Sequence, residues 1–135
     1  MYTSETKLTT RYGETDQMGI IYHANYINYY EIARTEMIRE IGYPYQEMEN
    51  DGIMMPVIEV QCKYIRPAYY DEELTIRTIV KELPTSRMTF HYEIYNAKQE
   101  LINTGIAVLA FMDGNTRRPC RPPEKMMQLI RQYFS

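Results

Sequence analysis

The chain is organised around the stretch Thr15-Asp16-Gln17-Met18-Gly19-Ile20-Ile21-Tyr22-His23-Ala24-Asn25-Tyr26, which stands immediately before the longest helical pattern in the sequence. A helix start carries backbone N–H donors without intrahelical acceptors, and the helix dipole adds a partial positive charge there. An acyl carbonyl at that terminus would be polarised, and Asp16 is close enough in sequence to assist attack on its carbon. The stretch therefore predicts a turn, a helix start and a site for acyl chemistry.

The helical pattern after this stretch has one broad apolar face, made by Tyr26, Tyr30, Ala33, Met37 and Ile41. Glu31 and Arg34 lie off the centre of that face, and Asn25 is a plausible N-cap. Gly42 followed by Pro44 is a strong stop signal, because glycine adopts the left-handed cap conformation and proline cannot continue a helix. We expect a long and largely buried helix.

The segments around this helix are strand-like. A short β-prone segment covers 7–12, and a long one covers 57–65 and ends before Pro67. Residues 74–81 and 88–95 alternate between apolar and polar, and 101–112 form the last strand. The last three of these strands have short connections, which is typical of an antiparallel meander. After a basic, proline-rich linker, Pro122-Pro123-Glu124 begins a terminal helix with Met127 and Ile130 near one face.

These elements predict an α+β fold in which a curved antiparallel sheet of about five strands wraps around a long central helix. No other segment is apolar enough to cover that helix. With 135 residues the chain is expected to form a single domain over 1–135.

Composition excludes several classes of function. The net charge of −3 argues against a nucleic-acid-binding surface. No apolar run is long enough to span a bilayer and no apolar secretory leader is visible, so we expect a cytoplasmic protein without a transmembrane segment. Cys62 and Cys120 are expected to stay reduced, and with His23 and His91 they have no metal-ligand spacing. The 14 tyrosines favour an oligomer, because tyrosine is enriched at interfaces.

Beyond composition, a family resemblance covers nearly the whole chain. Residues 12–26, read as Tyr12-Gly13-Glu14-Thr15-Asp16 and onward to Tyr26, resemble the signature of hot-dog-fold acyl-CoA thioesterases of the 4-hydroxybenzoyl-CoA thioesterase type. This group includes the bacterial branch encoded beside the Tol-Pal cell-envelope system. The resemblance continues through Glu31-Ile32-Ala33-Arg34-Thr35, Tyr64-Ile65-Arg66-Pro67-Ala68, Asp71-Glu72, Leu74 and Ser86-Arg87-Met88-Thr89-Phe90.

The resemblance implies an activity and a site. It implies hydrolysis of short-chain or aromatic acyl-CoA to free acid and CoA, without a cofactor, by a homodimer or homotetramer with sites across the subunit boundary. In this family the aspartate at the position of Asp16 is the catalytic carboxylate, and the backbone N–H at the position of His23 binds the thioester oxygen. The Tol-Pal branch also has histidine at that position.

Each candidate residue also has a plainer interpretation. Asp16 is expected to be the nucleophile or the general base, but an aspartate here can also simply cap its own turn. The His23 side chain would position the acyl group or protonate the leaving sulfur, and its plainer interpretation is a satisfied polar residue near a helix end. Asn25 and Glu31 are candidates to support the site.

The phosphates of CoA require a local basic patch, for which the candidates are Arg66, Arg87 and Arg118. Arg87 is favoured, because it follows the Pro84-Thr85-Ser86 turn and resembles the family's nucleotide-side loop. A solvated surface arginine is the alternative for each of them. Two other functions stay open: a non-catalytic acyl-CoA-binding module, and a dehydratase acting on hydroxyacyl thioesters.

Overall fold

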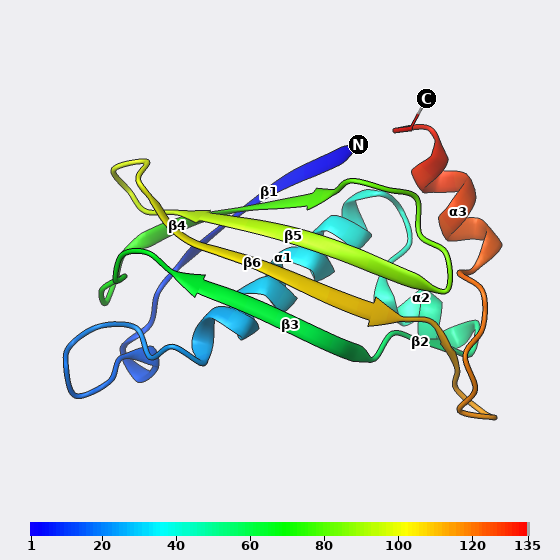
Figure 1. Cartoon of the computed structure of the whole chain (residues 1–135), viewed down its shortest axis with the longest axis horizontal. Helices are drawn as coiled ribbons and strands as arrows, with labels where there is room; N and C mark the ends of the chain where they lie inside the picture. Colours follow the sequence, from blue (N-terminus) through cyan, green and yellow to red (C-terminus); the bar gives the residue numbers. More distant parts are fainter. Residues whose placement is uncertain (135) are drawn as a thin grey trace.

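The computed structural model describes residues 1–134 and places helix α1 (Asn25–Glu40) against one face of a five-stranded antiparallel sheet (Figure 1). The sheet has the strand order β1-β4-β5-β6-β3. Its strands are β1 (Tyr2–Thr9), β3 (Val57–Tyr64), β4 (Glu73–Val80), β5 (Arg87–Tyr95) and β6 (Leu101–Ala110). The predicted α+β class and the meander of the three strands β4, β5 and β6 are confirmed.

Smaller elements connect these layers. A 3₁₀ turn η1 (Tyr12–Glu14) precedes the loop that enters α1, and α2 (Tyr45–Asn50) follows that helix. Strands β2 (Ile53–Met54) and β7 (Met112–Asp113) pair with each other, and α3 (Glu124–Arg131) is the last helix of the described chain. α3 buries Met126 and Ile130, whereas the predicted Met127 is only partly covered.

The core lies between α1 and the sheet. In β5 the side chains of Met88, Phe90, Tyr92 and Ile94 are buried against the helix, and those between them face the opposite, outer side of the sheet. The predicted helix face, Tyr26 to Ile41, is buried as expected. Gly105 of β6 makes room for the ring of Tyr30, which a Cβ atom there would overlap. Apolar residues recur at every second position in the strands and at helical spacing in α1. Each element therefore has one apolar face, and these faces pack together in the core.

Two local expectations were wrong, and one buried residue was not anticipated. β1 begins at Tyr2, well before the predicted segment, because it pairs with β4 from Tyr2 opposite Val80 to Thr9 opposite Glu73. Asn25 is the first helical residue and not the N-cap, which is Ala24, and the Asn25 side chain makes no cap hydrogen bond. Arg34 is buried with 7% of its surface exposed, because its long side chain reaches inward until Nη1 lies 3.5 Å from the Tyr92 hydroxyl.

Candidate active site

A hollow of about 380 Å³ lies where the loop 16–21, the start of α1 and the end of β3 meet. Figure 1 shows β3 ending beside the loop that leads into α1. The hollow is mainly apolar, and its lining includes both of the residues predicted to do chemistry. The lining residues are Asp16, Met18, Ile20, Ile21, His23, Tyr26, Tyr64, Ile65, Arg66 and Pro67.

Asp16 stands in a tight turn, as predicted. Its carbonyl accepts the Gly19 N–H at 3.1 Å, and its N–H donates to the Ile20 carbonyl at 2.9 Å. Gly19 has φ +80°, a conformation that glycine adopts without steric cost. The carboxylate oxygen Oδ1 accepts the Met18 N–H at 2.8 Å and the Ile20 N–H at 3.4 Å. Within residues 1–134 nothing donates to the second oxygen, Oδ2, so one carboxylate oxygen holds the turn while the other is available to a reactant.

The entry to α1 leaves backbone donors free. The Tyr22 N–H donates to the Glu14 carbonyl at 2.9 Å, and the Asn25 N–H donates to the Tyr22 carbonyl at 3.0 Å. Between them, the N–H groups of His23 and Ala24, which stand just before the first helical residue, find no acceptor in the described chain. The His23 N–H is therefore a candidate donor to an oxygen bound in the hollow.

Aromatic rings form one wall of the hollow. The rings of Tyr26 and Tyr64 meet edge to face, with centroids 5.3 Å apart, and the His23 ring lies 6.3 Å from Tyr64. The Tyr64 hydroxyl also donates to the His23 carbonyl at 2.9 Å. Tyr64 therefore connects the end of β3 to the helix start across the hollow. Tyr64 is 48% exposed, so part of this wall faces outward.

The other predicted residues are distributed more widely. Arg66 lines the hollow, with Nη1 3.7 Å from Glu100 Oε2. Arg87 instead lines a separate hollow beside the β4–β5 connection, and Arg118 lies in the turn after β7, where its carbonyl accepts the Asp113 N–H. Glu31 is exposed along α1 and is not part of the lining. The structure thus brings only Arg66 of the three arginines to Asp16.

The Asn25 side chain takes a supporting position that the capping interpretation did not anticipate. Its Nδ2 donates to the Glu14 carbonyl at 2.8 Å, which ties the helix start to the segment before Asp16. Sequence reasoning missed both Glu14 and Tyr64 as neighbours of the site. Their only signal was their place within the stretches that carry the family resemblance.

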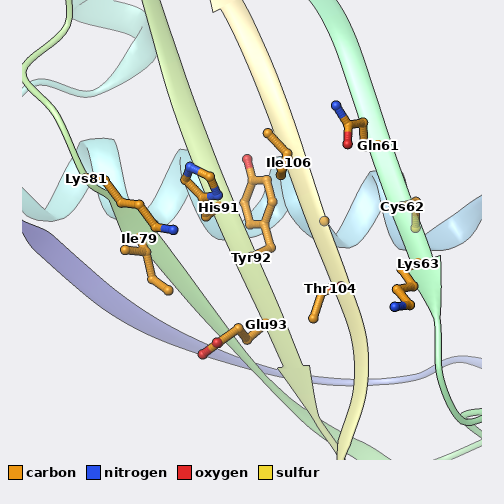
Figure 2. Close-up of a pocket in the computed structure, with 11 residues that line it drawn as sticks. Gln61, Cys62, Lys63, Ile79, Lys81, His91, Tyr92, Glu93, Thr104 and Ile106 are labelled. Atoms are coloured by element: carbon orange, nitrogen blue, oxygen red, sulfur yellow. The ribbon is translucent and has the colours of Figure 1, made fainter.

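The outer face of the sheet holds a second hollow, of about 370 Å³, shown in Figure 2. His91 and Lys81 lie side by side there, Ile79 and Ile106 flank His91 on the strands to either side, and α1 lies behind the sheet. Burial lowers the pKa of His91, Lys81 lowers it further, and Glu82 opposes the shift. Asp16 and His23 are not among the residues that line this face. His91 faces away from the core, since the buried residues of β5 are its neighbours Phe90 and Tyr92.

Two features are absent from residues 1–134. No helix there is both long and apolar enough to cross a membrane. In the same part of the chain, no group of three or more His, Cys, Asp or Glu side chains is arranged to hold a metal ion.

Comparisons with known proteins agree on one family. A model described as the thioesterase-like superfamily matches residues 10–130. The acyl-CoA thioesterase YbgC of Helicobacter pylori is 34% identical over 128 residues, covering 88% of this chain and 93% of the relative. The acyl-CoA thioester hydrolase YbgC of Escherichia coli O157:H7 is 29% identical over 121 residues, covering 90% of each. The crystal structure of a DHNA-CoA thioesterase from Staphylococcus aureus has a TM-score of 0.86 at 36% identity, covering 99% of this chain and 85% of that one.

Proposed function

The chain belongs to the thioesterase-like superfamily and is a thioesterase of the hot-dog fold, and on that premise we propose that Asp16 and the backbone N–H of His23 hydrolyse acyl-CoA thioesters. One observation carries the proposal. The carboxylate of Asp16, with Oδ2 free, and the unpaired N–H of His23 belong to residues that line the same apolar hollow.

In the proposed reaction the thioester carbonyl oxygen accepts the His23 N–H, and the acyl group occupies the apolar hollow. Asp16 then either attacks the carbonyl carbon or removes a proton from an attacking water. In the first case a C–O bond forms, the C–S bond breaks, CoA leaves as a thiolate, and water hydrolyses the resulting mixed anhydride. In the second case water adds directly and the same C–S bond breaks. Neither route uses a cofactor, since CoA is part of the substrate.

The oxyanion donor supplies a large share of the expected rate. A single preorganised donor of this kind is worth roughly 2.7–4 kcal/mol in acyl transfer. The His23 N–H gains further strength from its place at the positive end of α1. The His23 side chain, which is exposed beside Tyr22, would act on the acyl group or the leaving sulfur.

The substrate is proposed to be a CoA ester of a short-chain or aromatic acid. The aromatic wall formed by Tyr26 and Tyr64 and the limited volume of the hollow support this class. So do the names of the relatives, which act on acyl-CoA and DHNA-CoA. Arg66 is the favoured contact for the CoA phosphates, because it lines the hollow. Arg87 and Arg118 would contribute only if CoA extends beyond the hollow or if a second subunit presents them.

We also propose a homodimer formed through β3. This strand is an edge of the sheet, so one side of its backbone has no neighbouring strand in the described chain. Several large apolar side chains are exposed along it and just after it: Val57, Ile58, Tyr64 and Ile65, each at 45–48%. Pairing with a second copy would cover this edge and the open side of the aromatic wall.

The charges on β3 support one register for that pairing. Glu59, Gln61 and Lys63 follow one another at two-residue spacing on the outer face, opposite Val108, Ile106 and Thr104 of β6. In an antiparallel pair centred on Gln61, Glu59 of each copy stands opposite Lys63 of the other. Opposite charges at such cross-strand positions are favourable.

The test of the catalytic proposal is Asp16→Asn, which keeps an oxygen acceptor for the Met18 N–H and removes the charge. We expect a folded protein whose kcat for thiol release falls at least about 100-fold, because acid–base groups contribute about 10²–10⁴-fold. The assay is the release of free CoA thiol across acyl-CoA esters of different chain length and with aromatic acyl groups.

Asp113→Asn is the matched control. Asp113 Oδ1 accepts the N–H groups of Asn115 and Thr116 at 2.8 and 2.9 Å in a similar turn, but away from the hollow. This variant should keep wild-type turnover. Normal turnover by Asp16→Asn would remove Asp16 from the mechanism. If the wild type binds acyl-CoA without releasing thiol, the protein is a binding module. If it removes water from hydroxyacyl-CoA, the protein is a dehydratase.

A further inference from the structure

The contacts around Glu14 suggest a residue that acts on the reaction without touching the substrate. We propose that Glu14, held by Tyr29, is a positioning residue that fixes the Asp16 turn relative to the free N–H of His23. The inference rests on the proposed function of those two residues and adds Glu14 and Tyr29 to it.

The Glu14 side chain connects the segment before Asp16 to the interior of α1. Its Oε1 accepts the Arg11 N–H at 2.8 Å and the Tyr29 hydroxyl at 2.8 Å, and its Oε2 accepts Arg11 Nε at 3.0 Å. The Glu14 side chain is only 13% exposed, and Tyr29 is 1% exposed. Both partners of the Tyr29–Glu14 hydrogen bond are therefore held in place by the packing around them.

The charge state of Glu14 suits this contact. Burial by itself would raise the pKa of Glu14, but the Arg11 N–H, the Tyr29 hydroxyl and the Arg11 guanidinium together hold that pKa below its usual value. Glu14 is thus a carboxylate at neutral pH, and hydrogen bonds to a charged acceptor are stronger than those between neutral groups.

The Glu14 backbone is hydrogen-bonded to the segment that leads into α1. Its carbonyl accepts the Tyr22 N–H at 2.9 Å and Asn25 Nδ2 at 2.8 Å. Tyr22 directly precedes His23, and Asn25 is the first residue of α1. One residue therefore binds the chain on both sides of the oxyanion donor, and it does so two positions before Asp16.

These contacts restrict the position of the Asp16 carboxylate relative to the His23 N–H. Only Thr15 separates Glu14 from Asp16, and the Thr15 hydroxyl is itself bonded to the Tyr12 carbonyl. A shift of the helix start relative to the turn would change the separation between Asp16 Oδ2 and the His23 N–H. Misplacement by about 1 Å can cost about 10²-fold in rate, even when the change lies away from the chemistry.

The experiment compares Tyr29→Phe, Glu14→Gln and the double variant with wild type, using the thiol-release assay. We expect each single variant to lower kcat about tenfold or more with KM changed less than twofold. The double variant should be no worse than the more affected single variant, because both residues act through one contact. A residue that served stability alone would lower the Tm and leave the kcat of the folded protein unchanged.

Tyr30→Phe is the matched control. Tyr30 is the neighbouring buried tyrosine of α1, but its hydroxyl bonds to Asn103 and not to the loop before the helix. It should lose thermal stability and keep its kcat. Unchanged kcat in folded Tyr29→Phe would overturn the positioning role, and this variant decides the question even if Glu14→Gln does not fold. The proposed function has its own test: it is wrong if the wild type releases no thiol, or if Asp16→Asn turns over acyl-CoA as fast as the wild type.

Discussion

Gly105→Ala is expected to destabilise the protein through a single methyl group. An alanine Cβ at this position of β6 would overlap Cζ, Oη and Cε2 of the Tyr30 ring. That ring is fully buried and stacks on Tyr92, with centroids 4.3 Å apart and planes 7° from parallel. Its hydroxyl is bonded to Asn103 and lies 3.2 Å from Cys62 Sγ. The ring is therefore held on several sides and cannot simply turn away from the new methyl group.

The free energy of unfolding that Gly105→Ala removes is the sum of three contributions. Overpacking of a well-packed core costs about 1–3 kcal/mol. Loss of the Tyr30 hydrogen bond adds about 1 kcal/mol, and the removal of a flexible glycine from a strand returns about 0.5–1 kcal/mol. The net loss is about 1–3.5 kcal/mol, which lowers the Tm of a domain of this size by about 4–12 °C.

The assay is thermal and urea unfolding of Gly105→Ala beside Gly13→Ala. No atom lies within 4 Å of a Cβ built on Gly13, and its φ is not in the left-handed region, so this control should change stability little. A Gly105→Ala variant as stable as wild type would show that Tyr30 does not fill the space over Gly105, and would refute the description of this part of the core.

The remaining predictions concern protons and the edge strand. The pKa of His91 is lowered by burial and by Lys81, so the unfolded chain takes up a proton more readily than the folded one. Wild type should therefore lose stability as the pH falls below about 6.5, and His91→Gln should lose less of it between pH 7 and pH 5 in urea titrations. Equal slopes for the two proteins would contradict this. On β3, Lys63→Glu should weaken the dimer at low salt in sedimentation experiments, and Glu59→Lys combined with Lys63→Glu should restore it. A double variant as weak as the single one would reject the register centred on Gln61.

Local patterns were enough to predict the elements that carry the site. The helical period from Tyr26 to Ile41 and the alternation in β4 and β5 gave correct element types, since each reflects the geometry of a single segment. Gly42, at φ +103°, ends α1 where the sequence indicated, and Gly19 closes the Asp16 turn. The family signature directed attention to Asp16 and His23, which the structure brings to one hollow.

By itself, the sequence determined the class of fold, the family and the turn that holds Asp16. Only the tertiary structure decided how far β1 extends along β4, that Arg34 turns inward, and that Arg66 lies at the hollow while Arg87 and Arg118 do not. The physical reason is the range of the interactions. Tyr29 reaches Glu14 across 15 positions and Tyr64 reaches His23 across 41, and such contacts depend on the path of the chain in space, which no periodicity within one segment contains.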